Sequence, residues 1–309
     1  MIKHIARYNF LRIPTIFTGL LIAVLVTNFV VLESAQARDT LLVPEDFDLI
    51  QDAVDAASPG DVIQVASGTY NENVIVTIDE LRLQADGDDV VLDGSDLGGI
   101  GIHVLGTDGV RISGFIVENF EAGIVLEVAE DSRIRNIETR FNDSDTASLR
   151  DGLQLVDSHH NRIRNVYAHD NGHNGITLKS GSSNNDLKKN VTNDNGKNLA
   201  VGLNFGGCGI QLISSGNDNN SIIKNEAFRN GWGIQVGGGS NDNKVIRNES
   251  HENQRAGVVV LEPGSNNLIV RNDAEGNGTA DVAPSGTFDL FDQGELNNKW
   301  LNNQGSFNF

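Results

Sequence analysis

A unit that opens with glycine followed by an aliphatic residue, and that carries Asn-centred turns, recurs along this chain. The last three clear units, which start at Gly209, Gly233 and Gly257, are each 24 residues long. Further units start upstream at Gly101, Gly123, Gly152 and Gly175. A weaker unit starts downstream at Asp281. A repeat of this size indicates a stack of similar supersecondary units rather than a conventional globular domain.

Within a unit the apolar residues alternate with polar ones. Ile210 and Leu212 point to one side of the chain and Gln211 to the other, which is the period of a β-strand. The apolar runs are short and are separated by Gly, Asn, Asp and Ser, which favour turns. We therefore predict an all-β fold, a single-stranded parallel β-helix whose coils are stacked ~4.8 Å apart.

Asparagines recur at similar places in successive units. We expect these side chains to stack as a ladder of hydrogen-bonded amides: Asn165, Asn190, Asn225, Asn248 and Asn272. The glycine that opens each unit is expected at a point where a Cβ would not fit.

The two ends of the chain depart from the repeat. Residues 1–37 have basic residues, an apolar run and a small-x-small site at Ala35-Gln36-Ala37, as in a secretory signal peptide. Without cleavage, this segment would anchor the protein in a membrane. Residues 38–60 are expected to form an N-terminal cap with a short helix over Asp46–Ala57, and residues 61–309 the β-helix. Trp300 and Phe307 are expected to cover the core of the last coil.

The chain is strongly acidic. Its formal net charge is −19, and removal of residues 1–37, with three basic residues and one acidic residue, leaves −21. Such a charge argues against nucleic acid or an anionic membrane as partner. It is compatible with neutral sugars, with cations, or with acidic glycans bound through metal ions. The lone cysteine, Cys208, has no disulfide partner within the chain, and we expect a monomer.

The segment Ile50–Val76 resembles the start of right-handed parallel β-helix proteins of the pectin lyase-like superfamily. The coils are similar to repeats of periplasmic NosD-type proteins and mannuronan C5-epimerases. The likeness covers about residues 40–309 and implies a right-handed helix in an exported protein, periplasmic or extracellular. It does not settle activity, because the superfamily contains lyases, hydrolases, esterases, epimerases and non-enzymes.

One stretch is similar to a known enzyme motif. Residues 163–175 resemble a segment of alginate epimerases that follows their catalytic Asp-Pro-His. In this chain the places of that aspartate and histidine fall on Gln154 and Val156, and a further acidic place falls near Lys179. The Asp-Pro-His motif is therefore not found.

Two units are longer than the others, and their extra residues precede the next glycine, at about 142–151 and 193–208. Insertions in a solenoid map to loops on one face, often the binding face. We expect the two loops to flank the turn of the intervening coil, which carries His169, Asp170 and His173, and so to wall a small groove.

Alternation predicts which side chains form the floor of this groove. The second and fourth residues after each glycine should point outward and form an accessible polar stripe: Glu127, Gln154, Thr177, Lys179 and Gln211. We assign acid–base roles to Glu127, His173 and Lys179. Substrate contacts are assigned to Gln154, His169, Asp170, Thr177 and Gln211. Lys179 is also expected to form an ion pair with Glu127 or with a loop aspartate.

A metal is considered at the first long loop. Asp143, Asp145 and Asp151 supply the hard oxygen ligands that Ca²⁺ prefers. Copper is disfavoured, although NosD-type proteins are described as copper-binding. His159 and His160 fall in a different turn from His169 and His173, and the chain has one Met and one Cys for a soft ligand set.

Three functions remain open on the sequence. The preferred hypothesis is an exported protein that binds or processes an extended polysaccharide in the groove. The first alternative is a non-enzymatic scaffold or accessory module, as the NosD likeness implies. The second is a polysaccharide lyase or C5-epimerase.

Overall fold

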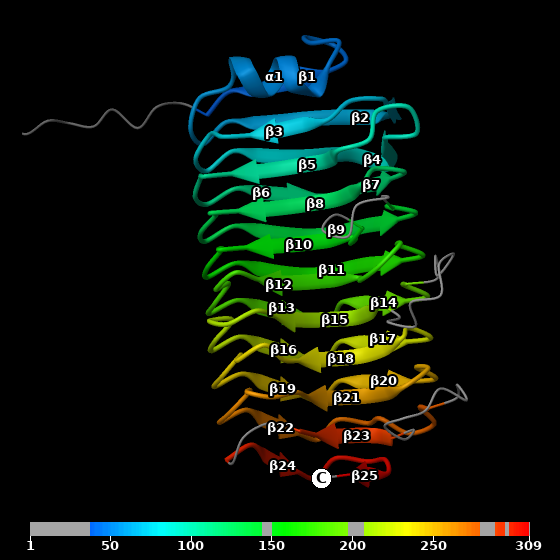
Figure 1. Ribbon diagram of the computed structural model, residues 1–309. Coiled ribbons are helices and arrows are strands. Elements are labelled where there is room, and N and C mark those ends of the chain that lie inside the picture. The colour runs from blue at the N-terminus through cyan, green and yellow to red at the C-terminus, as the bar shows by residue number, and fades with distance from the viewer. Residues whose placement is uncertain (1–37, 144–149, 197–206, 279–287, 294–296, 309) are drawn as a thin grey trace, which may run out of the picture. The chain divides into compact units, whose positions relative to one another are not determined.

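The computed structural model describes residues 38–143, 150–196, 207–278, 288–293 and 297–308. Residues Arg38–Phe309 form one compact unit. The signal-peptide segment, residues 1–37, lies outside the described residues. The unit is a right-handed parallel β-helix in which every strand pairing is parallel and joins neighbouring coils (Figure 1). The predicted fold class is confirmed.

The first strand of each coil lies in a ten-stranded sheet, here called sheet B. Along the stack its members are β3 (Val74–Val76), β5 (Ile100–Leu105), β8 (Ala122–Glu127), β10 (Leu153–Val156), β12 (Ile176–Lys179), β15 (Cys208–Ile213), β18 (Trp232–Val236), β21 (Ala256–Val260), β23 (Phe288–Asp292) and β25 (Phe307–Asn308).

The remaining strands form a fifteen-stranded sheet, sheet A, which bends once along each coil. Its first part comprises β1 (Thr40–Val43), β2 (Val62–Tyr70), β4 (Arg82–Asp93), β6 (Arg111–Ser113), β9 (Arg133–Arg140), β11 (Arg162–His169), β13 (Asp186–Lys188), β16 (Ser221–Ile223), β19 (Lys244–Ile246), β22 (Leu268–Val270) and β24 (Lys299–Leu301). After the bend come β7 (Phe115–Glu118), β14 (Val191–Asn193), β17 (Glu226–Phe228) and β20 (Glu249–His251), while β2, β4, β9 and β11 run through it.

The predicted helical cap is present but shorter than expected. Helix α1 covers Ile50–Ala56 and buries Ile50, Ala53 and Val54 over the first coil. The carboxylate of Glu72 accepts the backbone N–H groups of Ile50 and Gln51, each at 2.9 Å, and so caps the N-terminus of the helix. The residues before Ile50 form turns instead of helix, with the amide of Asp46 donating to the carbonyl of Leu42.

The C-terminal cap is confirmed. The Trp300 and Phe307 rings meet edge to face with centroids 4.8 Å apart, and both rings pack against the core. The indole N–H of Trp300 donates to Asp292 at 2.7 Å, which satisfies its polar end.

Three asparagine ladders, not one, run along the coils. The predicted ladder comprises Asn190, Asn225, Asn248, Asn272 and Asn303, and each side-chain oxygen accepts the backbone N–H of the preceding member. A second ladder lies five residues earlier in each coil: Asn161, Asn185, Asn220, Asn243, Asn267 and Asn298. A third lies five residues later: Asn142, Asn171, Asn195, Asn230, Asn253 and Asn277.

Asn165 does not belong to the ladder that was predicted to include it. It is exposed, with a φ of 52°, and the ladder position in that coil is the next residue, Val166, whose N–H donates to Asn190. The same left-handed conformation recurs just before the ladder asparagines, for example at Lys189 and Lys224. Each bend thus combines one left-handed residue with one buried asparagine.

The glycines that open the units are required by close packing rather than by a positive φ. A Cβ on Gly209 would lie 2.8 Å from the carbonyl oxygen of Gly233, and one on Gly233 would lie 2.3 Å from that of Gly257. The next residue in this column is Asp289, since Gly257 meets the Asp289 carbonyl oxygen. The last weak unit therefore starts at Asp289 and not at Asp281, which lies outside the described residues.

The register shows that coil length varies most at one corner of the coil. In the short coils, a third-ladder asparagine is separated from the next glycine only by residues 172–174, 231–232 or 254–256. In three coils the same interval holds residues 143–151, 196–208 and 278–288. The two predicted insertions are therefore at the expected corner, and a third was missed.

The ladders predict a specific sensitivity. Asn225→Ala should lower the free energy of unfolding by about 2–4 kcal/mol, because it leaves the buried N–H of Asn190, the side-chain oxygen of Asn248 and the carbonyl of Leu187 without this partner. Chemical denaturation followed by far-UV circular dichroism measures the change.

The matched control is Asn71→Ala, since Asn71 is exposed and makes one hydrogen bond, to the carbonyl of Asp93. We expect it to stay within about 0.5 kcal/mol of the parent. Equal effects of the two substitutions would contradict a stabilising role for the ladders.

Candidate functional site

The outer face of sheet B carries two adjacent rows of side chains in register. One row is the residue before each unit glycine, and includes Asp151, Asn174, Cys208 and Trp232. The other is the second residue after it, and includes Gln154, Thr177, Gln211 and Gln235. The register of the predicted stripe is therefore correct.

Hydrogen bonds join the two rows into one polar cluster. The Asn174 side-chain N–H₂ donates to the Thr177 hydroxyl and to the Gln211 oxygen, each at 2.9 Å, and its oxygen accepts the Cys208 backbone N–H at 2.7 Å. The Gln211 N–H₂ donates in turn to Gln235 at 2.6 Å. We call Asp151, Asn174, Thr177, Cys208, Gln211 and Gln235 the amide cluster.

The cluster is largely buried, which corrects the expectation of an accessible stripe. Gln154, Thr177 and Gln211 expose 1%, 2% and 8% of their surface. These side chains cannot be the groups that first meet a ligand from solvent. Their arrangement instead holds the edge of the cluster in place.

His173 lies at that edge. Its Nδ1 is 3.2 Å from the Asp151 carboxylate, which also accepts the backbone N–H of Asn174 at 2.9 Å. One third of the His173 side chain is exposed, whereas Asp151 is buried. The pair couples a buried carboxylate to an accessible imidazole.

Glu127 and Lys179 lie in the next outward row, with Val156 between them in register. One alternative predicted an ion pair between Glu127 and Lys179, and the structure does not form it. The Glu127 carboxylate lies 2.9 Å from Nε2 of His103, one coil earlier. Glu127 is therefore separated from the amide cluster and from His173.

His169 and Asp170 belong to a different face. His169 ends β11 on sheet A, where its ring stacks on Tyr167 at 4.2 Å and its two nitrogens lie 2.8 Å from Asp170 and 3.3 Å from Glu138. The predicted grouping of these two residues with the stripe is wrong, because a bend at Asp170 and the buried Asn171 separate them from His173.

The described residues do not form the predicted calcium site. Asp145 lies outside them, Asp143 lies against Gly172, and Asp151 is engaged by His173 and Asn174. Within the described ranges, no three His, Cys, Asp or Glu side chains are grouped so that they could hold a metal ion.

Two residues of this face were missed by the sequence reasoning. Trp232 is half-buried beside Cys208 in register, and the Arg255 guanidinium lies 5.3 Å from the centroid of its ring. Trp232 directly precedes Gly233, and alternation counted from the residue after each glycine does not reach this outward-pointing position.

The family model described as periplasmic copper-binding protein (NosD) matches residues 81–304. The chain belongs to this family. A search of curated proteins finds no match. No helix in the described part of this NosD-family chain has the length and apolar character needed to cross a membrane.

Solved structures with the same fold are mostly polysaccharide-processing proteins. An alginate lyase from Paenibacillus sp. str. FPU-7 is 17% identical with a TM-score of 0.53, and the match covers 88% of this chain and 99% of the lyase. Pectate lyase Pel9A is 15% identical with a TM-score of 0.59, covering 87% and 78%. The A-module of the Azotobacter vinelandii mannuronan C-5 epimerase AlgE6 is 18% identical with a TM-score of 0.52, covering 82% and 84%. At these identities the likeness establishes the fold.

The described residues of this NosD-family protein do not supply a soft ligand set for copper. The sulfur of Cys208 is 3.0 Å from the Gln235 oxygen in the amide cluster, and its burial, reinforced by the charge of Asp151, raises the pKa of the thiol far above its ordinary value. The protein has a single methionine, Met1. Copper sites that use soft ligands draw on thiolate and thioether groups that the described residues do not bring together.

The state of Cys208 yields a direct test. Because the thiolate is the reactive form, the native protein should resist alkylation by iodoacetamide at pH 8, while the protein unfolded in guanidinium should be labelled at one site. Intact-mass spectrometry counts the adducts. Rapid labelling of the native protein at Cys208 would show that the amide cluster is open to solvent.

Proposed function

We propose that this NosD-family protein binds an extended polysaccharide along the outer face of sheet B. The observation that carries the proposal is the amide cluster, a continuous hydrogen-bonded network across four successive coils beside a half-exposed indole. A sugar chain that runs along the stack would meet an equivalent position every ~4.8 Å.

The roles follow from exposure. The Trp232 ring offers an apolar surface for a sugar ring with Arg255 beside it, and His173 and Lys179 offer polar contacts in an earlier coil. The buried Gln154, Thr177 and Gln211 support these groups rather than touch the ligand. The insertions within residues 142–151 and 193–208 enter beside Asp151 and Cys208, which supports the proposal that they flank the site.

We test binding with the purified full-length protein on an array of neutral and acidic glycans, with and without Ca²⁺. Trp232→Ala and His173→Ala should each weaken binding to a retained glycan by about tenfold or more, since aromatic anchors dominate such contacts. Titration calorimetry measures the dissociation constant.

Tyr167→Ala is the control, because Tyr167 is an exposed aromatic residue on sheet A. It should leave the affinity within about twofold of the parent. Unchanged binding in both sheet B variants would overturn the assignment of the site.

A competing function is an accessory module that scaffolds a periplasmic assembly, for which the family description supplies the periplasmic location alone. Absence of binding to every glycan, together with co-purification of a stable protein partner, would favour this alternative. Release of unsaturated or epimerised products from a bound glycan would instead indicate lyase or epimerase activity.

A further inference from the structure

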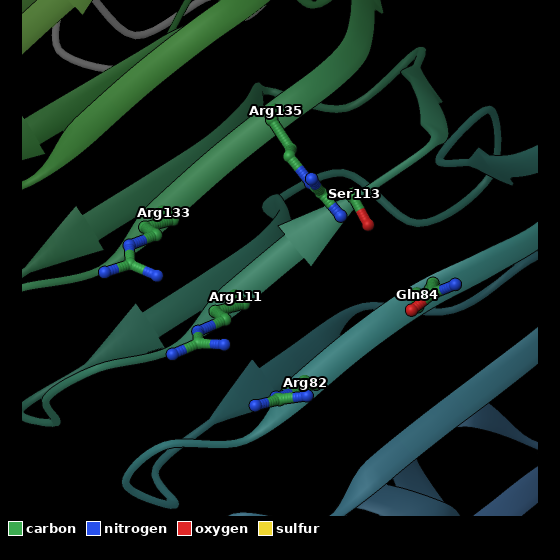
Figure 2. A pocket seen from close by; sticks show the side chains of 6 residues that line it. All are labelled: Arg82, Gln84, Arg111, Ser113, Arg133 and Arg135. Atoms are coloured by element: carbon green, nitrogen blue, oxygen red, sulfur yellow. The ribbon is translucent and has the colours of Figure 1, made fainter.

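Six arginines are stacked on the outer face of the first part of sheet A. Arg82, Arg111, Arg133 and Arg162 are consecutive partners in register on β4, β6, β9 and β11. A second column, two residues further along each strand, contains Arg135 and Arg164. Figure 2 shows Arg82, Arg111 and Arg133 projecting from three successive strands on the same side of the sheet. We call these six residues the arginine face.

The arginine face is a concentrated positive surface on a protein whose net charge is negative. The four strand segments that carry it read RLQ, RIS, RIR and RIR and contain no acidic residue, although the chain has a net charge of −19. One hollow is lined by Arg82, Arg111, Arg133 and Arg135, and the next by Arg133, Arg135, Arg162 and Arg164. Because the two hollows share Arg133 and Arg135, they form a continuous strip.

Little within the described residues neutralises this strip. Arg164 pairs with Asp186 at 2.5 Å, but the other five arginines make no ion pair with any described carboxylate. Burial and the neighbouring charges of Arg111 and Arg162 lower the pKa of Arg133, and only Asp131 opposes this effect. Like charges directly opposite one another on a sheet are destabilising, so the columns would be stabilised by an external anion.

The chemistry of the side chain selects the kind of anion. A guanidinium is a planar fork that binds carboxylate, sulfate or phosphate through two parallel hydrogen bonds. The forks repeat at the strand spacing of ~4.8 Å, so the matching ligand carries one anionic group per repeat of similar length. A hexuronate chain has one carboxylate per sugar ring, and a linked ring spans about one strand spacing.

We infer that the arginine face binds a polyuronate chain running along the stack, with one carboxylate per coil and without a bridging metal ion. This surface lies on sheet A and is distinct from the site proposed on sheet B. The acidic surface elsewhere would repel the polyanion and confine it to this strip. Nucleic acid and anionic membranes also carry repeated anions. The test below distinguishes binding to them from binding to a polyuronate.

The test uses the full-length protein and galacturonate oligomers of increasing length in the presence of a chelator. Affinity should rise with each added sugar up to four, the number of arginines in the first column, and then level off. It should also fall as salt is added, because the contacts are ionic.

Two triple variants locate the binding. Arg111→Gln/Arg133→Gln/Arg162→Gln should weaken tetramer binding by about tenfold or more, through loss of charge-assisted hydrogen bonds. Lys244→Gln/Arg271→Gln/Lys299→Gln removes the same charge from exposed positions further along sheet A and should stay within about twofold. Replacement of Arg111, Arg133 and Arg162 by lysine should give an intermediate affinity, because the positive charge is kept and the planar guanidinium fork is lost.

Several results would overturn the inference. These are equal binding by both glutamine variants, affinity that does not depend on oligomer length, or binding that requires Ca²⁺. Retention on vesicles of phosphatidylglycerol and phosphatidylcholine, or on single-stranded RNA, with no retention of polygalacturonate, would assign the arginine face to another polyanion. Because Trp232 and His173 lie on sheet B, failure here leaves the proposed glycan site untouched, and the reverse also holds.

Discussion

The register between coils depends on the buried asparagines. Each ladder amide accepts the backbone N–H of the preceding coil, and most also donate to a carbonyl of that preceding coil and to the next ladder oxygen, as Asn225 does. A slip of one residue between coils would break these bonds in all three ladders at once. The same bonds offset the cost of the left-handed residues before the asparagines. Both surface rows and arginine columns are aligned only because this register holds.

The fold could be predicted because its signal is repeated in every unit. Alternation around Gln211 placed the outward rows correctly, and the long coils marked the variable corner. One ladder was found and two were missed, although asparagines at positions 185, 190 and 195 are evenly spaced by five residues. Asn165 was misplaced because it occupies the left-handed position directly before the ladder position, which Val166 fills in that coil, and sequence spacing alone does not separate these two neighbouring positions.

The candidate site was harder to predict because burial is not periodic. Thr177 and Gln211 point outward, as alternation requires, yet they are covered. His169 and His173 are close in sequence, but a bend leaves His169 at the end of β11 on sheet A and places His173 at the edge of sheet B. The net charge of the chain was misleading in a similar way. It averages over all faces of the molecule and so hides a local basic surface. The two RIR triplets were visible in the sequence, but only the register shows that their arginines are stacked on those of β4 and β6.

In the coils that carry three ladder asparagines, the spacing of five between ladders fixes the length of two sides, whereas the corner after the third ladder admits segments of very different size. New chain can therefore be added to this protein without disturbing a single ladder bond, provided that it enters at that corner. Successive insertions would all emerge along the same edge of sheet B, beside Asp151, Cys208 and Asp289. Relatives sharing this framework are thus free to diverge in the surroundings of one edge while their cores remain interchangeable.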